Sequence, residues 1–245
     1  SARGRANDPA TFLPETPVGT DRCQGLSQGP FGSLALGACA GMGAGRVAAS
    51  HFSVMVKELS QVFVAGPPVA IALGENVTKE ELGGWKIQGQ NGTVDNVVDT
   101  EADAFEAARR FLSYLPPSVH HLPERTPPAD DPKRKEDFLL SIVPTDGKTP
   151  YKPRKIVEAT VDRHSFFEIG HDWGRGMVCG LARIDGHAVG VLAGDPFFLD
   201  RAWTADVCDK VTRPMVLCSM FHLPVIHFVD CPGFAVGVKA EKAGA

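Results

Sequence analysis

The chain has 245 residues, of which 43% are hydrophobic and 22% charged, and its formal net charge is −4. This composition is typical of a globular protein and excludes an intrinsically disordered chain. No block of Lys and Arg is longer than that in "PKRKED", which excludes a nucleic-acid-binding surface. No apolar run approaches ~20 residues and no signal peptide opens the sequence, so we expect no membrane span.

The six cysteines are scattered without a C-x-x-C pair, and several lie within or beside apolar runs. This spacing favours buried thiols over a disulfide framework or a metal site, and it predicts a reducing compartment, the cytoplasm or the mitochondrial matrix. The six are Cys23, Cys39, Cys179, Cys208, Cys218 and Cys231.

The first part of the chain alternates strand and helix patterns after a long polar loop over residues 1–25. A strand over 33–38 runs into a cluster of glycines, and a helix over 45–52 follows. Strands are expected within 53–57 and 60–68. Thr78 with Glu81 has the spacing of a helix capping box, and Thr100 with Asp103 caps a helix over 100–115.

The second part begins after residues 116–137, which hold six prolines and alternating charges and predict an extended linker. A short helix over 150–162 is followed by two strands within 177–196, joined at Asp185-Gly186, a hairpin-turn dipeptide. A helix over 204–221 contains Pro214, which implies a kink or a break. The apolar run 223–229 predicts a strand buried on both faces.

Two α/β halves joined by this linker indicate a domain over 1–115, a linker over 116–137 and a domain over 138–245, with a possible internal duplication. Each half has a strand that leads into a glycine-containing turn and then a helix.

The glycine cluster "GACAGMGAGR" is the first candidate for chemistry, because backbone N–H groups in such a strand-to-helix turn can point at an anion. An oxyanion hole and plain close packing of strand and helix are both consistent with it. A nucleotide site is less favoured, since the P-loop Lys-Ser/Thr and the G-x-G-x-x-G spacing are both missing.

The second candidate is "VDCPGF", in which Asp230 emerges at the end of the closing strand, where ligands bind in parallel α/β sheets. A simple turn, with Pro232 and Gly233 setting the backbone, is the competing interpretation. The histidines show no metal-ligand spacing, and the charged residues Asp200, Arg201, Asp206 and Lys210 are expected on a solvated helix face.

Several strings occur in an order typical of one family: "GACAG", "FVAGPP", "TKEELGG", "NGTVDNV", "DDPKRKEDFLLSIVP", "SFFEI", "GLARIDGHAVGVLAGDP" and "VDCPGF". From residue 27 onward the chain resembles the carboxyltransferase (β) subunit of biotin-dependent acyl-CoA carboxylases, of the propionyl-CoA carboxylase type. The resemblance implies an α/β fold of two crotonase-like (ClpP/crotonase) ββα-superhelix domains, an N-type and a C-type, each incomplete in this chain.

The same resemblance implies an enzyme of the ligase or transferase class that moves a carboxyl group from carboxybiotin to the α carbon of a short acyl-CoA. Two enolates, stabilised by backbone N–H donors, would carry the reaction. An oxyanion hole is implied at Gly41 and Met42, where Met42 replaces the second glycine of the family pattern, so that its side chain must point away. The CoA arm or a subunit interface is implied at Ala40, Gly66, Pro67, Gly83 and Gly84, and the biotin side at Asp230, Pro232, Gly233 and Phe234.

The partners implied are a biotin carboxylase, which uses ATP and bicarbonate, and a biotin carboxyl carrier (α) subunit, with this chain in a homohexamer. The second oxyanion hole and the substrate-selecting pocket are expected after residue 245, so we expect the 245 residues alone to be inactive. Two alternatives stay open: a non-catalytic crotonase-like scaffold or fragment, and a biotin-dependent decarboxylase or transcarboxylase subunit. Both alternatives are supported by two departures from the family pattern, which are His164 before "SFFEI" and the string "AGDPFFLDRAW".

Overall fold

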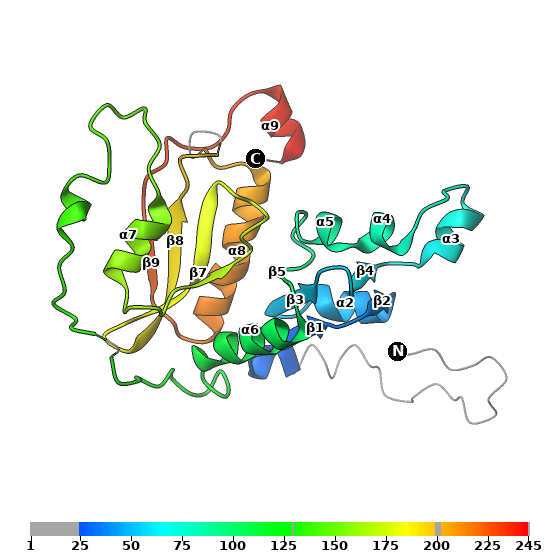
Figure 1. Ribbon diagram of the computed structural model, residues 1–245, viewed down its shortest axis with the longest axis horizontal. Helices are drawn as coiled ribbons and strands as arrows, with labels where there is room; N and C mark the ends of the chain where they lie inside the picture. The colour runs from blue at the N-terminus through cyan, green and yellow to red at the C-terminus, as the bar shows by residue number, and fades with distance from the viewer. Residues whose placement is uncertain (1–24, 129, 199–201, 245) are drawn as a thin grey trace. The chain divides into compact units, whose positions relative to one another are not determined.

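A computed structural model of the chain (Figure 1) describes residues 25–128, 130–198 and 202–244. The expectations for residues 1–24, including Cys23, and for Asp200 and Arg201 lie outside these residues. The chain divides into two compact units. Unit 1 takes in the described residues up to Ala108 together with Pro117–His120, and unit 2 takes in Arg109–Pro116 and the residues from His121 onward.

Unit 1 is built from short parallel strands and short helices. A three-stranded parallel sheet has the order β1-β3-β5, and a two-stranded parallel sheet pairs β2 with β4. The elements are β1 (Gly32–Ala35), β2 (Ala38–Ala40), α2 (Met42–Ala48), β3 (Phe52–Val56), β4 (Gln61–Phe63), α3 (Pro67–Ala72), α4 (Lys79–Gly83), α5 (Trp85–Gln88), β5 (Asn96–Val98) and α6 (Glu101–Ser113), whose last residues belong to unit 2.

The core of unit 1 explains why two expected boundaries were wrong. The expected strand over 33–38 is two strands in two different sheets, β1 and β2, with a break at residues 36–37. The helix expected over 45–52 is α2, which begins at Met42 and ends at Ala48. Its buried Ala44 and Val47 pack against β1, β3 and β4 side chains, so burial of this face, and not helix propensity over 45–52, sets its limits.

Both predicted capping pairs of unit 1 are confirmed. The Thr78 Oγ1 atom accepts from the Glu81 backbone N–H at 3.2 Å, while the Glu81 carboxylate accepts from the Thr78 N–H at 2.9 Å. Thr100 and Asp103 make the same reciprocal pair at the start of α6, at 3.2 and 3.1 Å. Such pairs satisfy backbone donors that a helix start leaves without partners.

Unit 2 contains a four-stranded sheet of order β6-β7-β8-β9, antiparallel except for the parallel pair β8–β9. Its elements are η1 (Asp137–Leu140), α7 (Pro153–Thr160), β6 (Phe167–Ile169), β7 (Met177–Ile184), β8 (His187–Gly194), α8 (Ala205–Met220), β9 (Val225–Phe228) and α9 (Val238–Ala243).

The central strands β7 and β8 are covered on both faces, with α7 on one side of the sheet and α8 on the other (Figure 1). Val157 of α7 packs in a cluster with Val178 and Val191, whereas Val207 of α8 packs with Cys179 and Leu192. Neighbouring residues of one strand point to opposite faces, so both faces need apolar side chains. This double cover explains the nearly continuous apolar sequence of the two strands.

The predicted hairpin between these strands is confirmed, with Asp185 (φ 49°) and Gly186 (φ 76°) at its turn and Ile184 paired with His187. The buried Asp162 carboxylate accepts both turn N–H groups, from Asp185 and Gly186, at 2.8 Å each. The Gly186 position also needs a glycine for space, since a Cβ there would lie 1.8 Å from the Thr126 carbonyl oxygen.

Helix α8 runs from Ala205 to Met220 without a break at Pro214, so of the expected kink or break only the kink stays a prediction. The expectation for Lys210 was wrong. Lys210 does not lie on a solvated face but is only 3% exposed, and its Nζ donates to the Met177 carbonyl at 2.7 Å. Gly170 and Gly174 leave room for its aliphatic stem, because a Cβ at either residue would contact it within about 3 Å.

The closing strand β9 is not buried on both faces as expected. It is the edge strand of the described sheet, its residues are half-buried, and His227 is exposed. The expected helix over 150–162 is confirmed as α7.

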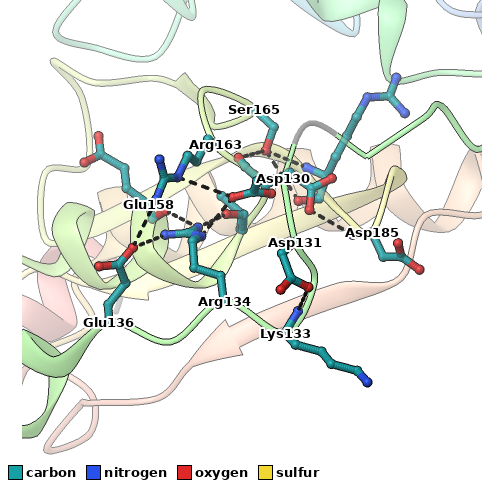
Figure 2. A network of polar contacts seen from close by, with 12 residues as sticks. Asp130, Asp131, Lys133, Arg134, Glu136, Glu158, Arg163, Ser165 and Asp185 are labelled. Carbon is teal, nitrogen blue, oxygen red and sulfur yellow. Dashed lines mark hydrogen bonds and ion pairs between the residues drawn. The ribbon is translucent and has the colours of Figure 1, made fainter.

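Residues 130–136 of the proline-rich segment belong to unit 2 and are held there by a cluster of charged side chains shown in Figure 2. Arg134 pairs with Asp130 at 2.8 Å and with Glu136 at 2.6 Å, and it donates to the Val161 carbonyl at 2.7 Å. These bonds raise the pKa of Arg134, the largest cause being the hydrogen bond to Glu136. The three-part division into 1–115, 116–137 and 138–245 stays a prediction.

Candidate functional site

The predicted oxyanion turn and the "AGPP" turn lie at the same edge of the small sheet in unit 1. Ala40 ends β2 and Phe63 ends β4, and these two residues are paired in parallel register. Gly41 and Met42 therefore leave the sheet beside Gly66 and Pro67, which start α3. The carboxyl edge of parallel strands is where α/β folds place ligands, because the turns there can vary while the sheet stays rigid.

Gly41 fixes the geometry of this turn. Its φ is 55° and it precedes the first residue of α2, and its own N–H donates to the Val64 carbonyl at 2.9 Å. That donor is therefore engaged within the fold. A non-glycine residue at this position would be strained by the positive φ.

Met42 follows as the first residue of α2, and its side chain is 63% exposed. The expectation that this side chain points away from the backbone agrees with that exposure. At the first two positions of a helix the N–H groups have no carbonyl four residues earlier within the helix, so the N–H groups of Met42 and Gly43 can bind an external acceptor. The turn can thus present backbone donors to a negatively charged oxygen.

Gly83 and Gly84 have a packing role that is visible in unit 1. A Cβ at Gly83 would lie 2.3 Å from the Val62 carbonyl oxygen, and one at Gly84 would lie 2.6 Å from the Glu80 carbonyl oxygen. Gly83 lets α4 approach β4 closely, and β4 is the strand that carries the "AGPP" turn, whereas Gly84 leaves room for Glu80 of α4 itself.

In unit 2 the segment 230–234 forms a tight loop that is held from two sides; we call it the PG loop. Tyr151 Oη donates a hydrogen bond to an Asp230 carboxylate oxygen. The Cys231 sulfur accepts the Gly233 N–H at 3.2 Å, and Gly233 has φ 131°. Pro232 and Phe234 complete the loop, and the Phe234 side chain is 64% exposed.

Sequence reasoning missed the two residues that hold the PG loop. Trp203 is bonded to it through the backbone, since Trp203 N–H donates to the Gly233 carbonyl at 3.0 Å and Ala235 N–H donates to the Trp203 carbonyl at 2.8 Å. In the sequence, the string "AGDPFFLDRAW" indicates only a departure from the family pattern. The contact of Tyr151 with Asp230 could not be predicted from the sequence, because a hydrogen bond between residues 79 positions apart leaves no local sequence pattern.

A second missed feature is a half-buried ionic cluster around Arg154 of α7. Its guanidinium makes two bonds to the Glu168 carboxylate, at 2.8 and 2.6 Å, and one to Asp195 at 2.8 Å. The pairing with Glu168, followed by that with Asp195, raises the pKa of Arg154 against the opposing effect of burial. The cluster ties α7 to β6 and to the end of β8, which makes it structural support.

The described surface also has two open clefts, of about 430 and 410 Å³, both in unit 2. Arg134, Glu136 and Phe138 line the first, and Arg110, Arg163 and His164 line the second. None of the predicted site residues lies among their walls.

Residues 28–245 match the carboxyl transferase domain family. The propionyl-CoA carboxylase carboxyltransferase subunit of Haloferax mediterranei is 36% identical, and the match covers 86% of this chain and 42% of that protein. The biotin-dependent long-chain acyl-coenzyme A carboxylase beta4 subunit of Mycobacterium tuberculosis is 34% identical, with 86% of this chain and 41% of that protein covered.

Among solved structures, a hexameric transcarboxylase 12S with hydrolysed methylmalonyl-coenzyme A bound has a TM-score of 0.84 at 30% identity. That match covers 89% of this chain and 43% of the other. The chain therefore belongs to the carboxyl transferase domain family, and the predicted crotonase-like α/β fold is confirmed. It spans about two fifths of the length of these relatives.

Proposed function

We propose that this chain takes part in carboxyl transfer between carboxybiotin and the α carbon of a short acyl-CoA, propionyl-CoA or a similar thioester. The observation that carries the proposal is the match of nearly the whole chain, in sequence and in fold, to acyl-CoA carboxyltransferases. Because the chain spans only about two fifths of those relatives, the proposal concerns the protein at its full encoded length.

In this proposal the Gly41–Met42 turn binds the oxygen that gains negative charge during transfer. Gly41 shapes the turn, and the N–H groups of Met42 and Gly43 donate to that oxygen, since the Gly41 N–H is engaged by Val64. A preorganised donor of this kind contributes roughly 3 to 4 kcal/mol to lowering the barrier. The exposed Met42 side chain leaves the backbone accessible.

The neighbouring turns would bind the rest of the CoA thioester or a second subunit. Ala40, Gly66 and Pro67 surround the Gly41–Met42 turn at the carboxyl edge of β2 and β4. Gly83 would act indirectly, by setting the position of β4, and Gly84 by leaving room for Glu80 at the end of α4.

We assign the biotin side to the PG loop. Biotin, bound covalently to a partner, supplies the activated carboxyl group. The loop has the features that a binding wall needs, a fixed backbone at Gly233 and an exposed aromatic ring at Phe234. Asp230 is held in place by Tyr151.

The proposed partners are a biotin carboxylase that uses ATP and bicarbonate, a biotin carboxyl carrier subunit, and further copies of this chain in a hexamer. Support comes from the biotin-dependent carboxylase relative and the hexameric transcarboxylase. We propose a reducing compartment, cytoplasm or mitochondrial matrix, on the five free cysteines of the described residues. Among those residues, no helix has both the length and the apolarity to cross a bilayer.

The test is carboxyl transfer in the reverse direction, with the full-length protein, methylmalonyl-CoA and free biotin. We expect propionyl-CoA and carboxybiotin in equal amounts. Carbon dioxide released without dependence on biotin would contradict transfer to biotin, and no turnover of any acyl-CoA, with or without the biotin-bearing partner, would support the scaffold alternative.

A further inference from the structure

Trp203 is the residue that joins the PG loop to the core of unit 2. Its ring packs against the cluster formed by Met177, Cys179, Leu192, Val207 and Val211, and it directly precedes the residue that caps helix α8. The Thr204 Oγ1 atom accepts the Val207 N–H at 3.4 Å in that cap. Trp203 is thus fixed by the helix on one side and by the sheet on the other.

The backbone of Trp203 pairs with the PG loop as a short parallel bridge to Phe234. Two hydrogen bonds, of 3.0 and 2.8 Å, join Trp203 to Gly233 and Ala235 on either side of Phe234. A loop bonded in this way cannot shift along its own direction without breaking both bonds.

The side chain of Trp203 adds a second contact to the same residue. The indole and Phe234 rings meet edge to face, with centroids 6.0 Å apart and planes at 72°. The His227 ring of β9 lies on Trp203 as well, at 6.2 Å. Edge-to-face pairs contribute about 0.5 to 1.5 kcal/mol beyond the area they bury. Phe234 is 64% exposed, and an exposed side chain ordinarily samples several rotamers. The contact with Trp203 therefore restricts the rotamers of the Phe234 ring.

The indole N–H takes no part in this arrangement. Trp203 Nε1 is buried and has no hydrogen-bond partner among the described residues. A buried donor without a partner destabilises a fold, so the tryptophan is not explained by its hydrogen bonding. The contribution of Trp203 to the PG loop comes from the contacts of its aromatic ring.

We propose that Trp203 is a positioning residue that sets the conformation of the PG loop and the orientation of the Phe234 ring for biotin. The inference rests on the proposed function, which assigns the loop to the biotin side. Trp203 acts through Phe234 and Gly233, and the bonded loop presents one geometry before biotin arrives.

The test compares Trp203→Leu, which removes the ring, with Trp203→Phe, which keeps an aromatic edge and removes the orphan N–H. Trp173→Leu is the matched control, a half-buried tryptophan of unit 2 outside this loop. The first measurement is hydrogen–deuterium exchange of the peptide 230–236 in the full-length protein, which needs neither substrate nor activity. We expect faster exchange in Trp203→Leu alone.

The second measurement is the binding of free biotin by calorimetry, together with KM for biotin and for methylmalonyl-CoA in the reverse reaction. Trp203→Leu should weaken biotin binding and raise its KM roughly 10- to 100-fold, as misplacement by about 1 Å does, with KM for the CoA ester unchanged. Trp203→Phe should restore both values to within about twofold of wild type, because a phenyl edge can still contact Phe234.

Unchanged exchange and unchanged biotin affinity in Trp203→Leu, with an active wild-type protein, would overturn the inference and leave the proposed function intact. A rise in KM for both substrates by the same factor would also overturn it, since that indicates general loosening of unit 2. A wild-type protein that neither binds biotin nor turns over would refute the proposed function instead, and the exchange measurement would still decide whether Trp203 holds the loop.

Discussion

At the scale of single residues, burial decides which titratable groups are reactive. Cys179 on β7 and Cys218 on α8 are buried in unit 2, whereas Cys39, Cys208 and Cys231 are half-buried. Burial raises the pKa of Cys179 to about 12 and that of Cys218 to about 11. The thiolate is the nucleophilic form, so these two thiols should be inert at neutral pH.

We therefore predict that iodoacetamide at pH 8 leaves Cys179 and Cys218 unmodified in the folded protein, since on the order of one thiol in 1,000 or fewer is ionised. Peptide mass spectrometry over time measures this, and labelling in denaturant is the control, where all five described cysteines should react. Modification of Cys179 as fast as Cys208 in the folded protein would contradict the prediction.

Lys210 is another buried titratable residue of unit 2. Desolvation by burial lowers its pKa below 10.5. Between that lowered pKa and 10.5 the unfolded chain binds more protons than the folded one, so stability rises with pH across this window. The cost of burying the charged Lys210 ammonium lowers the stability of the folded protein at neutral pH. This cost disappears as the ammonium loses its proton in the folded state.

A comparison with Lys210→Met tests this linkage. We expect the free energy of unfolding of the wild type, minus that of Lys210→Met, to increase as pH rises from about 8 to about 10. Urea denaturation at each pH measures it, and subtraction cancels the groups that the two proteins share. A difference that is flat or falls over this range would show that the pKa of Lys210 is not lowered in the folded protein.

At the scale of elements, α8 approaches β8 closely at one glycine. A Cβ at Gly190 would lie 2.5 Å from the Cys218 sulfur and 3.2 Å from a Val225 methyl. The absent side chain thus sets the spacing between the helix and the sheet at this point. Side chains in such a packed interior cannot move without disturbing their neighbours.

Gly190→Ala should therefore destabilise the protein by roughly 1 to 3 kcal/mol, as overpacking does. Adding Cys218→Ala removes the clashing sulfur, so the double variant should lose less than the sum of the two single changes. Gly45→Ala on α2 is the control, because nothing lies within 4 Å of a Cβ there. Denaturation midpoints of the wild type and the four variants measure the losses, and strictly additive losses would show that the contact with Cys218 does not limit the spacing.

The elements that the sequence predicted well are those determined locally. The Asp185-Gly186 hairpin and the Thr78–Glu81 cap depend on residues within four positions of each other. Tertiary contacts decided the others: the split of the expected strand over 33–38 follows from pairing in two sheets, and the burial of Lys210 follows from space left by Gly170 and Gly174. The PG loop could be predicted as a site from the family pattern, but Tyr151 and Trp203 could not, since both act across long sequence separations.

At the scale of the whole molecule, the proposed function assigns one class of site to each unit. Unit 1 has a turn with backbone donors, and unit 2 has a loop with a fixed backbone and an exposed ring. The turn of unit 1, at Gly41, Met42 and Gly43, has no nucleophilic or basic side chain, which fits a reaction that depends on stabilising charge on oxygen. The central claim is therefore that a backbone N–H group at Met42 supports the transfer.

Met42→Pro in the full-length protein tests this claim most directly, because it removes one N–H at the first position of a helix, where proline is well tolerated. Met42→Leu keeps the N–H and changes the side chain by a similar extent, and circular dichroism checks that both variants fold. In the reverse reaction with methylmalonyl-CoA and free biotin, we predict that Met42→Pro lowers kcat roughly 100- to 1,000-fold while Met42→Leu stays near wild type. Equal kcat values in a folded Met42→Pro variant and the wild type would contradict the account.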